Sequence, residues 1–65
     1  MVTLKEFEDQ NFYAVARVPR ETVLGSIPGY FTEKTKRMEI CLASEVDELK
    51  DSEDSDKEYI FFIME

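Results

Sequence analysis

The chain has 65 residues, 43% of them hydrophobic and 35% charged, with a formal net charge of −7 at pH 7 and no histidine. This length allows one small domain, residues 1–65, and such a domain buries only about 60% of the surface that its unfolded chain exposes. The negative charge argues against direct binding of nucleic acid or of an anionic membrane surface, because both require positive charge near phosphate groups. Tight packing or a second chain must supply stability, since the single cysteine, Cys41, forms no internal disulfide.

The lone cysteine and the polar start of the chain favour an intracellular, cytoplasmic protein. Residues 1–8 contain no apolar segment of the kind found in secretory signals. No stretch approaches the roughly 20 apolar residues that a membrane-spanning helix needs. Metal ligands do not cluster, and the only glycines are Gly25 and Gly29, so the sequence predicts no metal, no phosphate-binding loop and no cofactor.

The first predicted element is a short strand over residues 2–7. The apolar residues Val2 and Leu4 alternate with polar ones, as in a strand with one buried face, although Phe7 breaks the alternation. The polar residues 8–11 then favour a turn.

A second strand is predicted over residues 12–18. Its alternation places small alanines on one face, where they leave room for the bulk of Phe61 and Phe62. Pro19 ends the strand because proline cannot donate a ladder hydrogen bond. The residues expected to share that face are Phe12, Ala14, Ala16 and Val18.

Residues 20–28 allow two interpretations. Pro19 suits the first position of a helix and Gly25 suits its end, which predicts one or two helical turns. The alternative is a short strand through Thr22, Val23 and Leu24. Pro28 and Gly29 fit the centre of a type II turn, because glycine accepts the positive φ required there.

A third strand is predicted over residues 38–43. The polar residues 32–37 before it predict either the tip of a hairpin or an exposed helix start. In the strand itself, Met38, Ile40 and Leu42 share one face.

A short helix is predicted after that strand. Ser44, with Asp47 three residues later, has the spacing of a capping box in which Asp replaces Glu or Gln. This helix turns Val46 and Leu49 inward at i, i+3 spacing. Residues 51–57 then form an exposed acidic loop.

The last predicted strand, residues 59–64, organises the fold. It is six consecutive apolar residues, rich in aromatic and β-branched types and short for a helix. Because apolar side chains point to both faces, we expect this strand in the interior of a sheet, covered on each side. The sequence therefore predicts an α+β fold, mainly β: a small antiparallel sheet of about three to five strands with one or two short helical turns.

Negative charge is concentrated in an acidic segment, residues 45–58. It holds eight acidic residues and two lysines and carries −6, whereas residues 17–37 carry +3. One interpretation is a solvated loop that keeps an apolar-rich domain soluble. The other is a recognition surface whose carboxylates mimic nucleic-acid phosphates and block a basic, nucleic-acid-binding protein. A calcium loop is disfavoured, because the glycine and the ligand spacing of the usual loop are missing.

The working hypothesis is a non-enzymatic, protein-binding inhibitor. It is an analogy, from size and charge alone, with small acidic phage proteins that block host enzymes. The alternatives are a structural or assembly protein that self-associates through a sheet edge, including as a homodimer, and a small subunit of a larger complex. The predicted partner-binding residues are Glu45, Asp47, Glu48, Asp51, Glu53, Asp54, Asp56, Glu58, Tyr30 and Phe31.

Catalysis is not predicted, because no histidine is present for acid–base chemistry near neutral pH. Cys41 lies in an apolar strand, where a thiol behaves as a small hydrophobe; to act as a nucleophile it needs a cationic neighbour such as Lys36 or Arg37. Ser52 and Ser55 lie among acids and are candidate phosphorylation sites.

Overall fold

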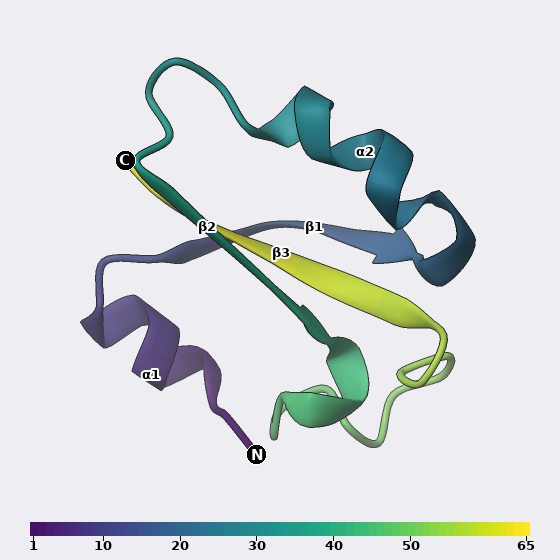
Figure 1. The fold of residues 1–65 in the computed structure, drawn as a ribbon. Coiled ribbons are helices and arrows are strands. Elements are labelled where there is room, and N and C mark those ends of the chain that lie inside the picture. The colour runs from purple at the N-terminus through teal and green to yellow at the C-terminus, as the bar shows by residue number, and fades with distance from the viewer.

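The computed structural model describes residues 1–65 and is an α+β fold built on a three-stranded antiparallel sheet (Figure 1). The strands are β1 (Tyr13–Pro19), β2 (Arg37–Leu42) and β3 (Glu58–Met64), arranged in the order β1-β3-β2. The α-helices are α1 (Leu4–Asp9) and α2 (Val23–Tyr30), and the 3-10 helices are η1 (Arg20–Thr22) and η2 (Ala43–Glu45). The C-terminal strand is central, as the sequence predicts.

Strand β3 is buried on both faces. Residues 60–63 are each at most 4% exposed. Phe62 stacks on Phe7 of α1 with the ring centroids 3.8 Å apart, whereas Phe61 meets Tyr30 of α2 edge-on at 5.3 Å. Successive side chains of a strand point to opposite faces, so α1 and α2 lie on opposite sides of the sheet (Figure 1). The predicted interior strand with cover on each side is confirmed.

Strand β1 contains an irregularity that changes which residues share a face. Ala14 lies opposite Phe62 and Ala16 lies opposite Phe61, with the register shifting between the two alanines. A bulge of this kind inserts one extra residue, so the alanines point to opposite faces. Each alanine does lie opposite a phenylalanine, as expected. The predicted single face made of Phe12, Ala14, Ala16 and Val18 is wrong.

Residues 4–9 form a helix in place of the predicted first strand. The Thr3 hydroxyl accepts a hydrogen bond from the Glu6 amide at 3.2 Å, and the Glu6 carboxylate accepts one from the Thr3 amide at 3.1 Å. This capping box satisfies two amide donors at the start of the helix and outweighs a weak alternation of apolar residues. Only Val2 pairs as a strand residue does, in an isolated parallel bridge with Val46.

Residues 20–30 are helical, which decides between the two interpretations of this region. The 3-10 helix η1 leads into α2, which runs through Gly25, Pro28 and Gly29. The predicted helix end at Gly25 and the predicted type II turn are both wrong, and neither glycine has a positive φ. Pro28 has no amide hydrogen to donate to the carbonyl of Leu24, so α2 lacks one helical hydrogen bond at this position.

Strand β2 confirms the third predicted strand, but its flanks differ from the prediction. Residues 31–36 pass through a turn between α2 and β2, so they form neither a hairpin tip nor a helix start. The predicted helix capped by Ser44 is wrong, because Ser44 lies inside the 3-10 helix η2 and residues 46–50 form a β-bridge and turns. Val46 is fully buried, and Leu49 packs against the core, as predicted.

Candidate functional site

The acidic segment is a series of turns closed by its own backbone. The amides of Leu49, Ser52 and Ser55 each donate to the carbonyl three residues earlier, at 2.9, 3.0 and 3.3 Å. The Ser55 hydroxyl donates to the Lys50 carbonyl at 2.9 Å and the Ser52 hydroxyl to the Leu49 carbonyl at 2.7 Å. Ser55 is only 9% exposed. Both serines considered as phosphorylation sites therefore hold these turns together.

The start of the acidic segment is attached to the beginning of the chain. The Val2 amide donates to the Glu45 carbonyl at 2.9 Å, and the Asp47 amide donates to the Val2 carbonyl at 2.8 Å. The Glu48 carboxylate accepts a hydrogen bond from the Leu4 amide, with both oxygens at 3.1 Å. A carboxylate at the first turn of a helix is favourable because the amides there lack partners within the helix.

Arg17 of β1 attaches the other end of the acidic segment to the sheet. Its guanidinium donates to the Glu58 carboxylate at 2.8 Å and to the Glu53 carbonyl at 2.8 Å. The Arg17 and Glu58 side chains are 29% and 27% exposed, so water and salt screen this pair less than a surface pair. Glu58 therefore serves the fold and is not free to meet a partner.

The predicted partner-binding acids fall into two groups. Besides Glu48 and Glu58, two carboxylates have partners within the chain: Asp47 with Lys50 at 3.3 Å and Asp54 with Lys57 at 3.9 Å. Four exposed carboxylates form no hydrogen bond or ion pair; they are Glu45, Asp51, Glu53 and Asp56.

The two predicted aromatic anchors do not join this surface. Tyr30 is half-buried at the end of α2, where its ring contacts Phe61 in the core. Phe31 follows it and is 51% exposed. Both lie at the C-terminal end of α2, on the opposite side of the sheet from the acidic segment (Figure 1). The predicted site is therefore divided between two surfaces.

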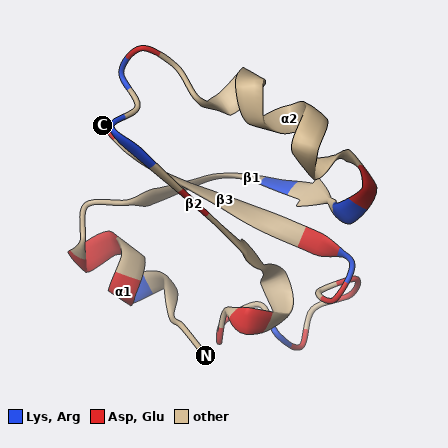
Figure 2. Ribbon diagram, viewed as in Figure 1, with Lys and Arg blue, Asp and Glu red and all other residues tan.

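Helix α1 extends the acidic surface in a way that sequence reasoning missed. It carries three acids, Glu6, Glu8 and Asp9, against Lys5, and all four are exposed. The bridge from Val2 to the acidic segment holds α1 beside that segment, and Figure 2 shows the acids of both on the same side of the sheet. We call α1 and residues 45–58 together the acidic face. The capping-box spacing of residues 3–6 was the available signal for this helix.

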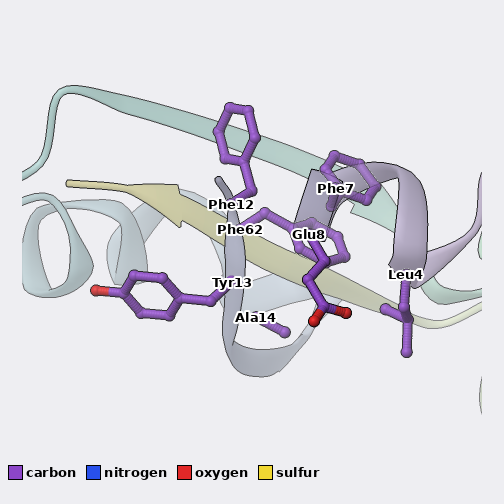
Figure 3. Close-up of a pocket in the computed structure, with 7 residues that line it drawn as sticks. All are labelled: Leu4, Phe7, Glu8, Phe12, Tyr13, Ala14 and Phe62. Atoms are coloured by element: carbon purple, nitrogen blue, oxygen red, sulfur yellow. The ribbon is translucent and has the colours of Figure 1, made fainter. Parts of the chain in front are cut away.

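A groove of about 310 Å³ opens between α1 and β1 (Figure 3). Six of its seven lining residues are hydrophobic, and Glu8 is the only charged one. In the view of Figure 3, the Glu8 carboxylate lies between the side chains of Leu4 and Ala14. Since the groove exists only where α1 packs on β1, a sequence interpretation without that helix could not have found it. The lining residues are Leu4, Phe7, Glu8, Phe12, Tyr13, Ala14 and Phe62.

Two groups near these surfaces have raised pKa values. Burial, reinforced by the negative charges of Glu45 and Glu39, raises the pKa of the Cys41 thiol to about 11. The thiol is therefore protonated at neutral pH, and the charges acting on it are acidic rather than the cationic neighbours considered above. The Tyr13 hydroxyl donates to the Glu65 carboxylate at 2.7 Å, and this hydrogen bond is the main cause that raises the pKa of Tyr13.

No three Cys, Asp or Glu side chains lie close enough together to hold a metal ion. None of the helices combines the length and the apolar composition that crossing a membrane requires. Compared with known proteins, the chain matches no family model, no curated protein and no solved structure.

Proposed function

We propose that the protein is a non-enzymatic binding module that inhibits a basic, nucleic-acid-binding protein through its acidic face. The observation that carries this proposal is the group of four exposed and unpaired carboxylates, at residues 45, 51, 53 and 56, on a backbone held by turns and anchors. Charged residues on a backbone already held in place lose less conformational freedom on binding than charged residues on a disordered loop. A nucleic-acid-binding surface fits this arrangement because it is built to accept closely spaced phosphate charges.

The distribution of charge supports the same partner. The acidic segment carries −6 and α1 carries −2, so the acidic face is more negative than the whole chain at −7. Such a face attracts a positive surface before contact, within a screening length of about 8 Å at physiological ionic strength. The proposal includes a cytoplasmic location, because a single free cysteine suits a reducing compartment.

The test uses two variants with identical chemical changes. Glu45→Gln/Glu53→Gln neutralises two free carboxylates of the acidic face, and Glu21→Gln/Glu33→Gln neutralises two exposed ones outside it. Wild-type protein is used to capture partners from an extract of its own cells. We expect the captured protein to bind labelled duplex DNA or RNA and to release it when wild-type protein is added.

The two variants then separate a specific surface from general attraction. The Glu45→Gln/Glu53→Gln variant should lose capture and displacement, while the Glu21→Gln/Glu33→Gln variant should retain both. Equal activity of the two variants, with folding confirmed by circular dichroism, would reject the acidic face as the binding surface.

Self-association is a second candidate function, favoured by the outer surface of α2. Residues 22–32 contain no charged side chain, Leu24 is 80% exposed and Phe31 is 51% exposed. A helix that is apolar all round is normally buried, so this surface suits contact with another chain. The sheet edges predicted from the sequence offer a second route, since β1 and β2 each pair only with β3.

Sedimentation at micromolar concentration tests this second candidate. A dimer that is lost in a Leu24→Ser/Phe31→Ser variant supports contact through α2, and a dimer that persists in that variant implicates the sheet edges. A strictly monomeric wild-type protein removes the candidate.

A further inference from the structure

We propose that the groove between α1 and β1 receives an arginine or lysine side chain of the basic partner; this inference rests on the proposed function. The groove joins an apolar lining to one carboxylate, Glu8, which no other lining residue neutralises. A long basic side chain has the same two parts, an apolar stem and a cationic head. With a volume of about 310 Å³ the groove lies at the small end of the range of ligand pockets, which suits one side chain.

The wall of the groove is a packed aromatic cluster. Phe7 stacks on Phe62 with the ring planes 6° apart, and Phe12 meets Phe7 edge-on with the ring centroids 5.9 Å apart. Phe12 and Phe62 are at most 4% exposed, so the core holds these rings in position before a ligand arrives. Ala14, which lies opposite Phe62, lines the groove with a small side chain.

This aromatic cluster already accommodates one guanidinium group. The guanidinium carbon of Arg37 lies 5.9 Å from the centroid of the Phe12 ring. Aromatic faces attract cations at this distance, and arginine makes such contacts more often than lysine. Phe7, Phe12 and Phe62 also line the groove, and Phe7 is the least buried of the three, so a cation in the groove meets the cluster at Phe7.

Glu8 supplies the charge for the cationic head. Its carboxylate is exposed and forms no ion pair or hydrogen bond within the chain, and its neighbour Asp9 adds a second negative charge. The Glu8 carbonyl accepts the Asn11 amide at 3.0 Å, and Asn11 has a φ of 69°, which turns the chain from α1 into β1. The exposed Glu8 carboxylate lines the groove, where a guanidinium can donate to both of its oxygens.

The experiment is an NMR titration of the full chain with three blocked tripeptides, Gly-X-Gly. X is arginine, citrulline, which is an uncharged analogue of arginine, or norleucine, which keeps only an apolar stem. We expect the arginine peptide to bind with an affinity of about 1 mM and to shift the amide signals of Tyr13, Ala14 and Phe62. The two uncharged peptides should shift these signals weakly or not at all.

Two variants each remove one negative charge from helix α1. Glu8→Gln removes the carboxylate that lines the groove, whereas Asp9→Asn makes an equivalent change on the same helix outside the groove. We expect Glu8→Gln to weaken binding of the arginine peptide by up to about fivefold, as the loss of an exposed charge pair would, and Asp9→Asn to weaken it less than about twofold.

The remaining outcomes decide separately about this inference and about the proposed function. Equal binding of the norleucine and arginine peptides would make the groove an apolar site, and equal losses in the two variants would leave only general electrostatic attraction. The arginine peptide could fail to bind in the groove while Glu45→Gln/Glu53→Gln still abolishes partner capture. This result would reject the inference and leave the proposed function standing. If the arginine peptide binds in the groove but Glu45→Gln/Glu53→Gln leaves partner capture unchanged, this inference is retained and the proposed function is lost.

Discussion

The acidic segment and strand β3 are neighbours in the sequence, but different interactions hold them. Residues 60–63 of β3 are each at most 4% exposed, whereas Val46 and Ser55 are the only buried residues of the acidic segment. Side-chain packing between two helices holds β3, while backbone turns and a few anchoring contacts hold the segment. The four free carboxylates of the segment, at residues 45, 51, 53 and 56, can therefore change without disturbing the core, as the proposed recognition surface requires.

The largest effect that tests this contrast is expected at β3. Phe61→Ala and Phe62→Ala should each lower the free energy of unfolding by about 3–5 kcal/mol, because each leaves a cavity between the sheet and a helix. The core of a chain this short supplies only about 3–5 kcal/mol of net stability, so either variant should be partly or largely unfolded. Urea denaturation followed by circular dichroism measures this. Phe31→Ala is the matched control outside the core and should change stability by less than about 0.5 kcal/mol.

A smaller effect is expected where the acidic segment meets the sheet. Arg17→Met keeps an apolar stem but removes the bonds to Glu58 and Glu53, and it should cost about 1–2 kcal/mol. Amide exchange should accelerate in the acidic segment more than in β3. Lys57→Met is the control, since the Lys57 and Asp54 side chains of that pair are 74% and 53% exposed. Equal losses of stability in the two variants would show that the Arg17 contacts do not anchor the segment.

The sequence predicts the sheet better than it predicts the elements around it. The six apolar residues 59–64 need cover on both faces of their strand, which predicts its interior position in the sheet. The alternation in residues 38–42 identifies β2. The bulge in β1 was not predictable, because no glycine marks it and it depends on pairing with β3.

The helices and the groove were harder to predict for a specific physical reason. Contact of Tyr30 with Phe61 favours a helix through Gly25 and Pro28, although isolated propensities oppose it. In residues 2–7, the capping box favours a helix and the alternation of apolar residues favours a strand. The groove exists only because the helix forms. The charges of the acidic segment were evident from the sequence, but which of them are free depends on tertiary contacts such as the one between Arg17 and Glu58.

An effect of about 1 kcal/mol is expected at the cap of α1. Thr3→Ala removes the hydroxyl that accepts the Glu6 amide and should destabilise the first turn of the helix. Because α1 forms one wall of the groove, binding of the arginine peptide should weaken together with stability. Thr3→Ser retains the hydroxyl and should preserve both, as measured by urea denaturation and NMR titration. If a destabilised Thr3→Ala variant binds the peptide with full affinity, peptide binding in the groove does not depend on the helix cap.

The smallest effect on stability at neutral pH is expected at Cys41, which lies where the acidic segment meets β2. Its pKa of about 11 against an ordinary value of 9.0 means that folding favours the protonated thiol. The stability that this provides is fully present below pH 9 and is lost as the pH rises through 11. At pH 8 the folded chain should react with iodoacetamide about 100-fold more slowly than the chain unfolded in urea, in proportion to the thiolate fraction. Glu45→Gln should speed the reaction of the folded chain, because the Glu45 charge contributes to the raised pKa; an unchanged rate would assign the shift to burial and Glu39.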